Sequence, residues 1–164
     1  MVLRSLVRLA LFVSILAIFT PVMPAFAHSF NAADIKINHP YATPTSVGVR
    51  NGAVYFRSIH NNGKKADRLL SARTDIADRI ELHHMLMDGT VMRMREVASI
   101  LLPLGDGPSF RNGQTDAYHL MLINLKTPLK EGDRFNVWLK FENSGEKEVT
   151  VKVQKSKETS HEHH

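Results

Sequence analysis

Histidine and methionine side chains gather in one stretch of this sequence. Residues 81–94 hold two histidines and four methionines on either side of an Asp88-Gly89 dipeptide. A second stretch, residues 118–122, reads Tyr-His-Leu-Met-Leu. Thioethers favour Cu(I) and imidazole accepts copper in either oxidation state, whereas Mg²⁺ and Ca²⁺ prefer oxygen ligands. The two stretches therefore indicate a site for a soft metal ion.

Strand periodicity indicates which of these side chains can converge. Alternating residues predict strands at 79–87 and 91–97, joined as a hairpin by a turn at Asp88-Gly89. Ten residues separate His83 from Met94, so we expect hairpin pairing to place these two side by side.

A third predicted strand, residues 117–125, completes the set. Its apolar and aromatic positions form the natural core face, so His119 and Met121 project together from the other face. The predicted metal ligands are His83, Met94, His119 and Met121.

Other residues are weaker candidates. Three methionines flank the site and either hand copper in and out or simply pack: Met85, Met87 and Met92. A His-rich tract near the C-terminus either binds Cu(II) or Zn²⁺ or is an idle solvated end: His161, His163 and His164. His84 falls on the core side, which favours packing, and His28 would offer an amine and an imidazole to Cu(II) if it became the N-terminus.

The remaining pattern predicts an all-β sandwich or barrel. Short alternating runs with turn signals between them predict further strands at 35–37, 53–59, 67–72, 134–142 and 148–153. His39-Pro40 should end the first of these strands, 74–78 should form a single helical turn, and 105–116 should be a polar loop.

The N-terminus resembles an export signal. Arg4 and Arg8 precede an apolar run at 9–19, and residues 25–27 read Ala-Phe-Ala, a small-x-small cleavage site. The competing interpretation is an uncleaved anchor, but the apolar run is about half of the ~20 residues that a membrane span needs. We therefore expect a signal peptide at 1–27, one domain at 28–154, a flexible His-rich tail at 155–164, and export to a bacterial periplasm.

Composition excludes several functions. The chain has no cysteine, which rules out disulfides, thiolate metal sites and a blue-copper centre. The formal charge of +5 is scattered among acids, so nucleic acid is not an expected partner. The sequence contains neither a G-x-S-x-G nor an H-E-x-x-H motif, so we expect a binding protein rather than an enzyme.

Several segments resemble the periplasmic copper chaperones of the PCuAC family. They are ELHHM, DGTVMRMREV, YHLMLINLKTPLKEGDRFNVWLKFE and the upstream GAVYFRSIHNNGKKADRLLSA, and the likeness runs from about residue 35 to 153. The family pattern is H-(M)-x₁₀-M-x₂₁-H-x-M. The resemblance implies a cupredoxin-like Greek-key β-sandwich, with His83, Met94, His119 and Met121 as Cu(I) ligands.

The resemblance also implies partners and leaves alternatives. The family role would be to deliver copper to the copper centre of cytochrome c oxidase, through its copper-accepting subunit or another copper chaperone.

The spacing of the ligands departs from the family pattern at one place. Here residues 95–118, 24 in number, separate Met94 from His119, so the loop before His119 is longer than the family's 21. Copper storage or resistance is the main alternative, and a structural or adhesive sandwich is a third. We expect a monomer without stable membrane insertion after signal cleavage.

Overall fold

The computed structural model describes residues 34–155, which contain ten β-strands, and the all-β prediction is confirmed. The strands are β1 (Ile35–Ala42), β2 (Gly52–Asn61), β3 (Asp67–Arg73), β4 (Ala77–Asp88), β5 (Val91–Glu96), β6 (Ile100–Leu102), β7 (Gly105–Asp106), β8 (Ala117–Leu125), β9 (Arg134–Phe141) and β10 (Glu146–Val153). No helix within residues 34–155 has the length and apolarity to cross a membrane. The predicted signal peptide and His28 lie outside the described residues, as does the tail from residue 156 onward.

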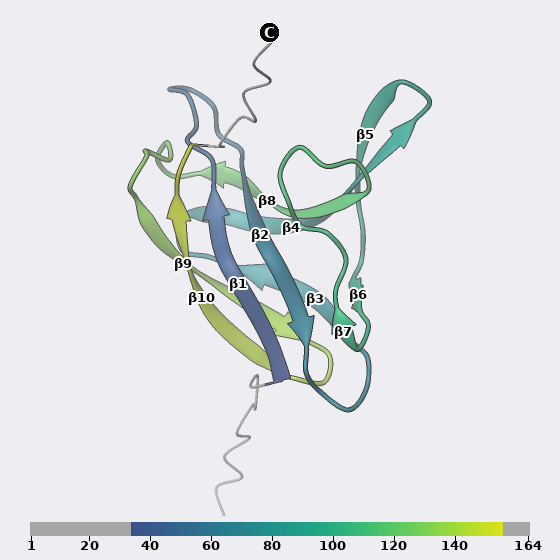
Figure 1. The fold of residues 1–164 in the computed structure, drawn as a ribbon. Helices are drawn as coiled ribbons and strands as arrows, with labels where there is room; N and C mark the ends of the chain where they lie inside the picture. The colour runs from purple at the N-terminus through teal and green to yellow at the C-terminus, as the bar shows by residue number, and fades with distance from the viewer. Residues whose placement is uncertain (1–33, 156–164) are drawn as a thin grey trace, which may run out of the picture.

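The strands form one hydrogen-bonded sheet that curls around a single core (Figure 1). Their order is β5-β4-β8-β2-β1-β10-β9-β3-β6, and β7 also pairs with β2. β7 follows β6 directly and pairs with the end of β2, His60 opposite Asp106 and Asn61 opposite Gly105. The far end of the sheet therefore returns to its middle, which encloses the apolar side chains between the two curled halves.

Alternation along the strands supplies this core. In β9 every second side chain is buried, from Phe135 through Val137 and Leu139 to Phe141. On β8, Leu120 and Leu122 are fully buried, and on β4 Leu82 lies directly opposite Leu120. β4 and β8 thus turn one shared face toward the core and leave the other face for a different use.

Three predicted boundaries were wrong. β1 does not end at His39-Pro40, because His39 adopts a φ of 49° that lets the strand bend and continue pairing with β2 to Ala42. Residues 74–78 form no helical turn, since the chain bends at residues 75–76 and β4 begins at Ala77. The loop predicted at 105–116 starts with the two residues of β7.

The same loop is anchored between β2 and β8. These strands pair only from Gly52–Leu122 to Val54–Leu120. Farther along, the Phe56 N–H donates to the Phe110 carbonyl (3.1 Å) and the Tyr118 N–H donates to the Ser109 carbonyl (2.8 Å). Residues 109–110 therefore occupy the place of a strand, and the Phe110 ring packs in the core against Phe56 and Tyr118.

Asp67 joins the start of β3 to the β9–β10 turn. Its buried carboxylate accepts hydrogen bonds from the Ser144 hydroxyl (2.6 Å) and from the backbone N–H groups of Arg68, Asn143 and Ser144. Burial alone would raise the pKa of Asp67, but these hydrogen bonds outweigh it and lower the pKa. The carboxylate is therefore ionised and fully engaged in the folded protein.

We predict that Asp67→Ala lowers the free energy of unfolding by roughly 2–4 kcal/mol, because it leaves several partly buried N–H donors without their acceptor. Asp67→Asn should lose less, since its amide keeps one accepting oxygen. Urea unfolding at neutral pH measures both, with the exposed Asp78→Ala as control. A loss for Asp67→Ala no larger than for the control would contradict this role.

Candidate metal centre

The face of β4 and β8 that points away from the core carries the predicted ligands in successive cross-strand rows. Because paired residues share a face and faces alternate, the register defines these rows. In order along β4 they are Glu81–Met121, His83–His119–Glu96, Met85–Ala117–Met94 and Met87–Met92. His83, Met94, His119 and Met121 therefore all project from one face.

The hairpin register differs from the prediction by two residues. The turn lies at Gly89 and Thr90, so Asp88 pairs with Val91 and remains in β4. Gly89 takes a φ of 62° at the first turn position, where glycine is favoured in two-residue hairpins. Met94 consequently pairs with Met85, and Glu96 lies opposite His83, so the expected His83–Met94 pair was wrong. A shift of two residues keeps Met94 on the same face.

His83 and His119 lie directly opposite one another, with ring centroids 5.4 Å apart. Their Nδ1 atoms are buried, and neither has a hydrogen-bond partner. No other buried side-chain nitrogen or oxygen in residues 34–155 lacks one. An unsatisfied buried polar atom costs about 1–3 kcal/mol. Two such atoms on neighbouring imidazoles are the donors that a metal ion would use.

A carboxylate orients one of these rings. Glu81 lies 3.0 Å from His83 Nε2 through Oε2, and its Oε1 accepts from Arg79. The hydrogen bond from His83, followed by that from Arg79, lowers the pKa of Glu81. An ionised carboxylate can only accept, so His83 Nε2 carries a proton, and in the neutral form of the ring the lone pair is then at Nδ1. Sequence reasoning missed Glu81, although its position two residues before His83 places it on the same face.

His119 is the most enclosed of the predicted ligands, with 2% of its surface exposed. Its ring lies between His83 and Tyr55, whose centroid is 5.9 Å away, and Tyr41 extends this row beyond Tyr55. The backbone N–H of Asn112 donates to the Tyr41 hydroxyl (3.2 Å), which places the long loop near the row. Tyr55 was also missed, because its place beside His119 depends on the β2–β8 register.

Burial, and secondly the neighbouring His83, lowers the pKa of His119 to about 4. Protonation would place a positive charge in a poorly solvated space beside another imidazole. His119 is therefore neutral at pH 7, the state in which imidazole binds a metal.

The two methionines lie on either side of the histidine row. Met121 is half-buried and one row toward Glu81, whereas Met94 is one row toward the turn and 59% exposed. Rows on one strand face are about 7 Å apart, and long side chains interact along such diagonals. The structure thus joins the two histidines directly and leaves the two methionines as diagonal neighbours.

The remaining candidates fall into three groups. Met85 is 7% exposed and packs at the base of the hairpin, while Met87 and Met92 form an exposed pair near its tip. His84 lies on the opposite face, stacks on Tyr118 with centroids 4.1 Å apart, and has Nε2 2.7 Å from Asp116. His161, His163 and His164 lie outside the described residues, so the metal-binding tail stays a prediction.

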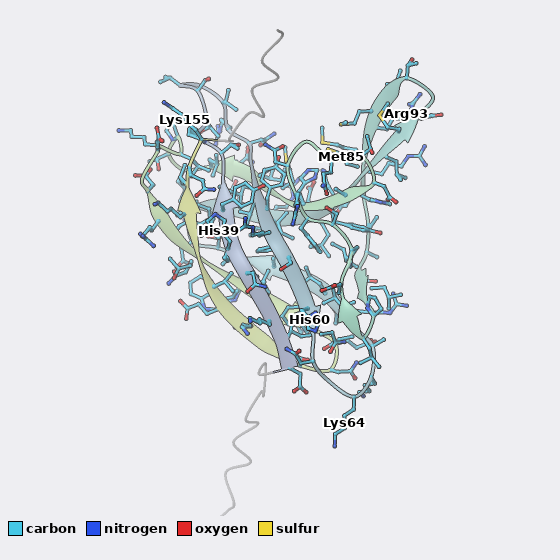
Figure 2. The ribbon with its side chains drawn as sticks, in the orientation of Figure 1. His39, His60, Lys64, Met85, Arg93 and Lys155 are labelled. Carbon is cyan, nitrogen blue, oxygen red and sulfur yellow. The ribbon has the colours of Figure 1, made fainter. Side chains whose placement is uncertain are left out.

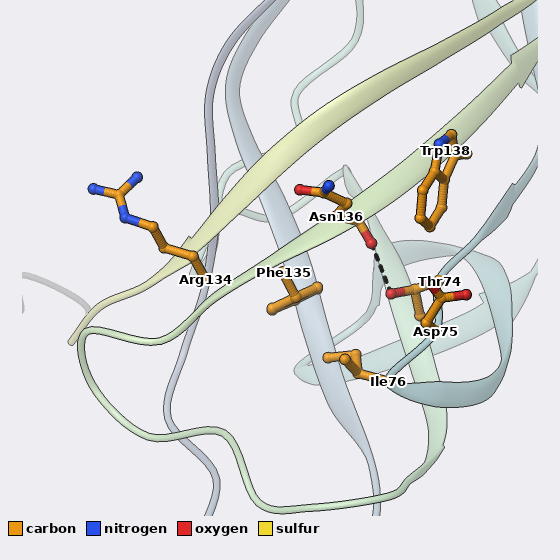
Figure 3. Close-up of a pocket in the computed structure, with 7 residues that line it drawn as sticks. All are labelled: Thr74, Asp75, Ile76, Arg134, Phe135, Asn136 and Trp138. Atoms are coloured by element: carbon orange, nitrogen blue, oxygen red, sulfur yellow. Dashed lines mark hydrogen bonds between the residues drawn. The ribbon is translucent and has the colours of Figure 1, made fainter.

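A surface pocket lined by other residues than the predicted ligands lies between the start of β9 and the segment before β4 (Figure 3). Trp138, Arg134 and residues 74–76 contribute to its lining, and the Thr74 hydroxyl donates to the Asn136 carbonyl (2.8 Å). The lining contains neither histidine nor methionine. In residues 34–155 no three or more His, Asp or Glu side chains group in a way that could hold a metal.

We predict that the metal-free protein loses stability as the pH falls from about 6.5 toward 4, because His119 takes up its proton more readily when unfolded. A lowered folded-state pKa stabilises the fold above the unfolded value and loses that effect on acidification. From pH 7 to pH 5 the contribution of His119 should fall by roughly 2 kcal/mol.

Urea unfolding at both pH values, with a chelator present, measures this change. His119→Gln should show a smaller loss between the two pH values, whereas Leu101→Ala, an exposed substitution that removes no titratable group, should behave as the unaltered protein. Equal pH dependence in all three proteins would rule out His119 as the source.

Comparison with known proteins shows the family and the fold. The model of a family described as putative lipoprotein LpqE-like matches residues 35–153. The uncharacterized protein RP573 of Rickettsia prowazekii (strain Madrid E) is 32% identical over 125 residues, which are 74% of this chain and 67% of that protein. A putative lipoprotein of Leifsonia xyli subsp. xyli, Lxx21020, is 27% identical over 60% of this chain and 58% of its own length.

Several solved structures have the same fold as this chain. The apo PCuAC domain from PmoF1 is 23% identical with a TM-score of 0.62, covering 75% of this chain and 95% of that domain. The copper-bound PCuAC domain from PmoF2 is 20% identical with a TM-score of 0.62, covering 75% and 94%. The solution structure of CuI-DR1885 from Deinococcus radiodurans is 24% identical with a TM-score of 0.59, covering 74% and 80%. The chain belongs to the LpqE-like family, and its fold is that of the PCuAC domains, as the sequence resemblance implied.

Proposed function

We propose that this protein is an exported copper chaperone that binds one Cu(I) ion through His83, His119, Met94 and Met121. The observation that carries the proposal is the pair of buried Nδ1 atoms, on facing imidazoles, that have no hydrogen-bond partner. Glu81 fixes the His83 ring with its Nδ1 lone pair available, and the lowered pKa of His119 keeps that ring neutral. His119 can therefore bind a metal without first releasing a proton, and Glu81 holds the His83 ring with Nδ1 turned away from the carboxylate.

The surrounding donors select the kind of metal. Thioethers are soft ligands that favour Cu(I), and they are weak donors for Zn²⁺ and for hard cations. Met94 and Met121 share the sheet face of the two histidines and lie one row to either side of them, so both sulfurs can turn toward the histidine row. Two solved relatives in this fold are described as copper-bound and as a CuI form, which supports the same choice for this chain.

Met94 suits a protein that releases its metal again. Its side chain is exposed on the edge strand β5, while His119 is enclosed. A partner can therefore reach the copper from the Met94 side and replace this neutral thioether first, before the more enclosed imidazole lets go. Transfer then proceeds by exchange of one ligand at a time.

The physiological role proposed here is delivery in the periplasm after removal of the 1–27 leader. The acceptor would be the copper centre of cytochrome c oxidase, reached through its copper-accepting subunit or another chaperone. The family name of the Leifsonia relative, a putative lipoprotein, supports an exported protein. In this role the protein binds and hands over an ion and catalyses no reaction.

We predict that Met94→Leu combined with Met121→Leu weakens Cu(I) binding by about a hundredfold, which is about 2.7 kcal/mol. The change removes two sulfur donors while conserving side-chain volume, so the fold should persist. Competition with a Cu(I)-specific chelator under reducing, anaerobic conditions measures the affinity.

Leu101→Ala, an exposed apolar substitution away from the site, serves as the control and should leave the affinity unchanged. An unaltered affinity in the double variant would disprove these ligands. One tight Cu(I) per chain, and its transfer to the isolated copper-accepting domain of the oxidase, would support delivery, whereas several ions of similar affinity would support storage.

A further inference from the structure

The methionines of the β4–β5 hairpin form a ladder that extends beyond the proposed copper site. Met85 pairs with Met94, and one row farther out Met87 pairs directly with Met92. All four share the face that carries His83 and His119. We call Met87 and Met92 the outer pair. Residues 86–88 of β4 pair with β5 alone, so the outer pair lies on an arm without support from β8.

This arm projects from the body (Figures 1 and 2). Figure 2 places the labelled Met85 where the arm leaves the body and Arg93 far out on it. Every residue of β5 is exposed, including Met92 at 47%, and Met87 across from it is 44% exposed. Core packing therefore explains buried Met85, but it does not explain why large apolar side chains occupy both positions of the outer pair.

The outer pair has the chemistry of a metal site. Directly opposed residues in an antiparallel pair have Cβ atoms about 4.5–5.5 Å apart. Methionine has three rotatable bonds, so both sulfurs can turn toward one ion between them. The nearby carboxylate does not contribute to this site. Asp88 forms an ion pair with Arg93 (2.8 Å), and both side chains project from the opposite face of the arm. Two neutral thioethers favour a soft monovalent cation over Zn²⁺ or Ca²⁺.

We propose that Met87 and Met92 form a second, outer binding site for Cu(I), weaker than the inner one. It lacks imidazole and stands in solvent, so its ion exchanges readily. The Met85–Met94 row lies between the outer pair and the histidines. An ion held at the tip thus has sulfur donors at each step toward His83 and His119, and the arm is the route by which copper enters and leaves. The outer site itself does not depend on the proposed function, whereas its use as a route for copper rests on that function.

Titration with Ag(I), a soft monovalent ion that does not change oxidation state, tests the outer site. The readout is the NMR signal of each ¹³C-labelled methionine methyl group, assigned by substitution, which separates these sites from any histidine in the tail. The first equivalent should shift Met94 and Met121. Further Ag(I) should shift Met87 and Met92, with an apparent affinity at least about tenfold weaker. In Met87→Leu/Met92→Leu, which removes both outer sulfurs, the shifts of Met94 and Met121 with the first equivalent should persist.

Leu86→Ala/Val91→Ala is the matched control, because it removes exposed apolar side chains from the opposite face of the same arm and keeps all sulfurs. It should retain outer binding. Methyl signals of Met87 and Met92 that never move as Ag(I) is added would overturn the outer site. If Met87 and Met92 respond while Met121 does not, the outer site stands and the inner assignment fails.

Discussion

The facing of His83 and His119 across β4 and β8 is the constraint on which the candidate centre depends. It holds two imidazole nitrogens without partners at one place, which is unfavourable unless something binds them. The β4–β8 ladder, paired from Ala77–Leu125 to Met85–Ala117, enforces it. A slip by one residue would turn Leu82 and Leu120 out of the core. The apolar face therefore stabilises the register that the polar face needs.

The two ends of the centre differ in how firmly they are held. His119 is enclosed between Tyr55 and His83, and the loop residues Ser109 and Phe110 close the gap where β2 and β8 separate. Met94 is on an edge strand whose six residues are all exposed. Such a strand, with few buried contacts, opens locally at low free energy. One side of the centre is thus rigid and pre-oriented, while the other can exchange ligands without disturbing the core.

Much of this could be read from the sequence, because strand alternation and turn residues are local signals. The alternation of apolar residues along β9, for example, predicted that strand from its own sequence. The failures involve long-range contacts. His39 continues β1 because β2 pairs on both sides of its unusual φ, and Phe110 is buried because a gap between distant strands receives it. The residues next to His39 and Phe110 in the sequence give no signal that predicts either contact.

The hairpin register is a more instructive failure, because it was wrong and yet preserved the face. Moving the turn from Asp88-Gly89 to Gly89-Thr90 changes each pairing by two residues, an even number, so Met94 still projects beside the histidine row. Parity therefore predicts which donors share a face even where it misplaces the row. The row matters for mechanism. If Met94 binds the same ion as the imidazoles, its side chain has to turn back along the strand from its diagonal position, which withdraws an exposed side chain from water. Copper binding would then bury apolar surface at the base of the arm as well as satisfy the two nitrogens, which couples the state of the arm to the loading of the centre.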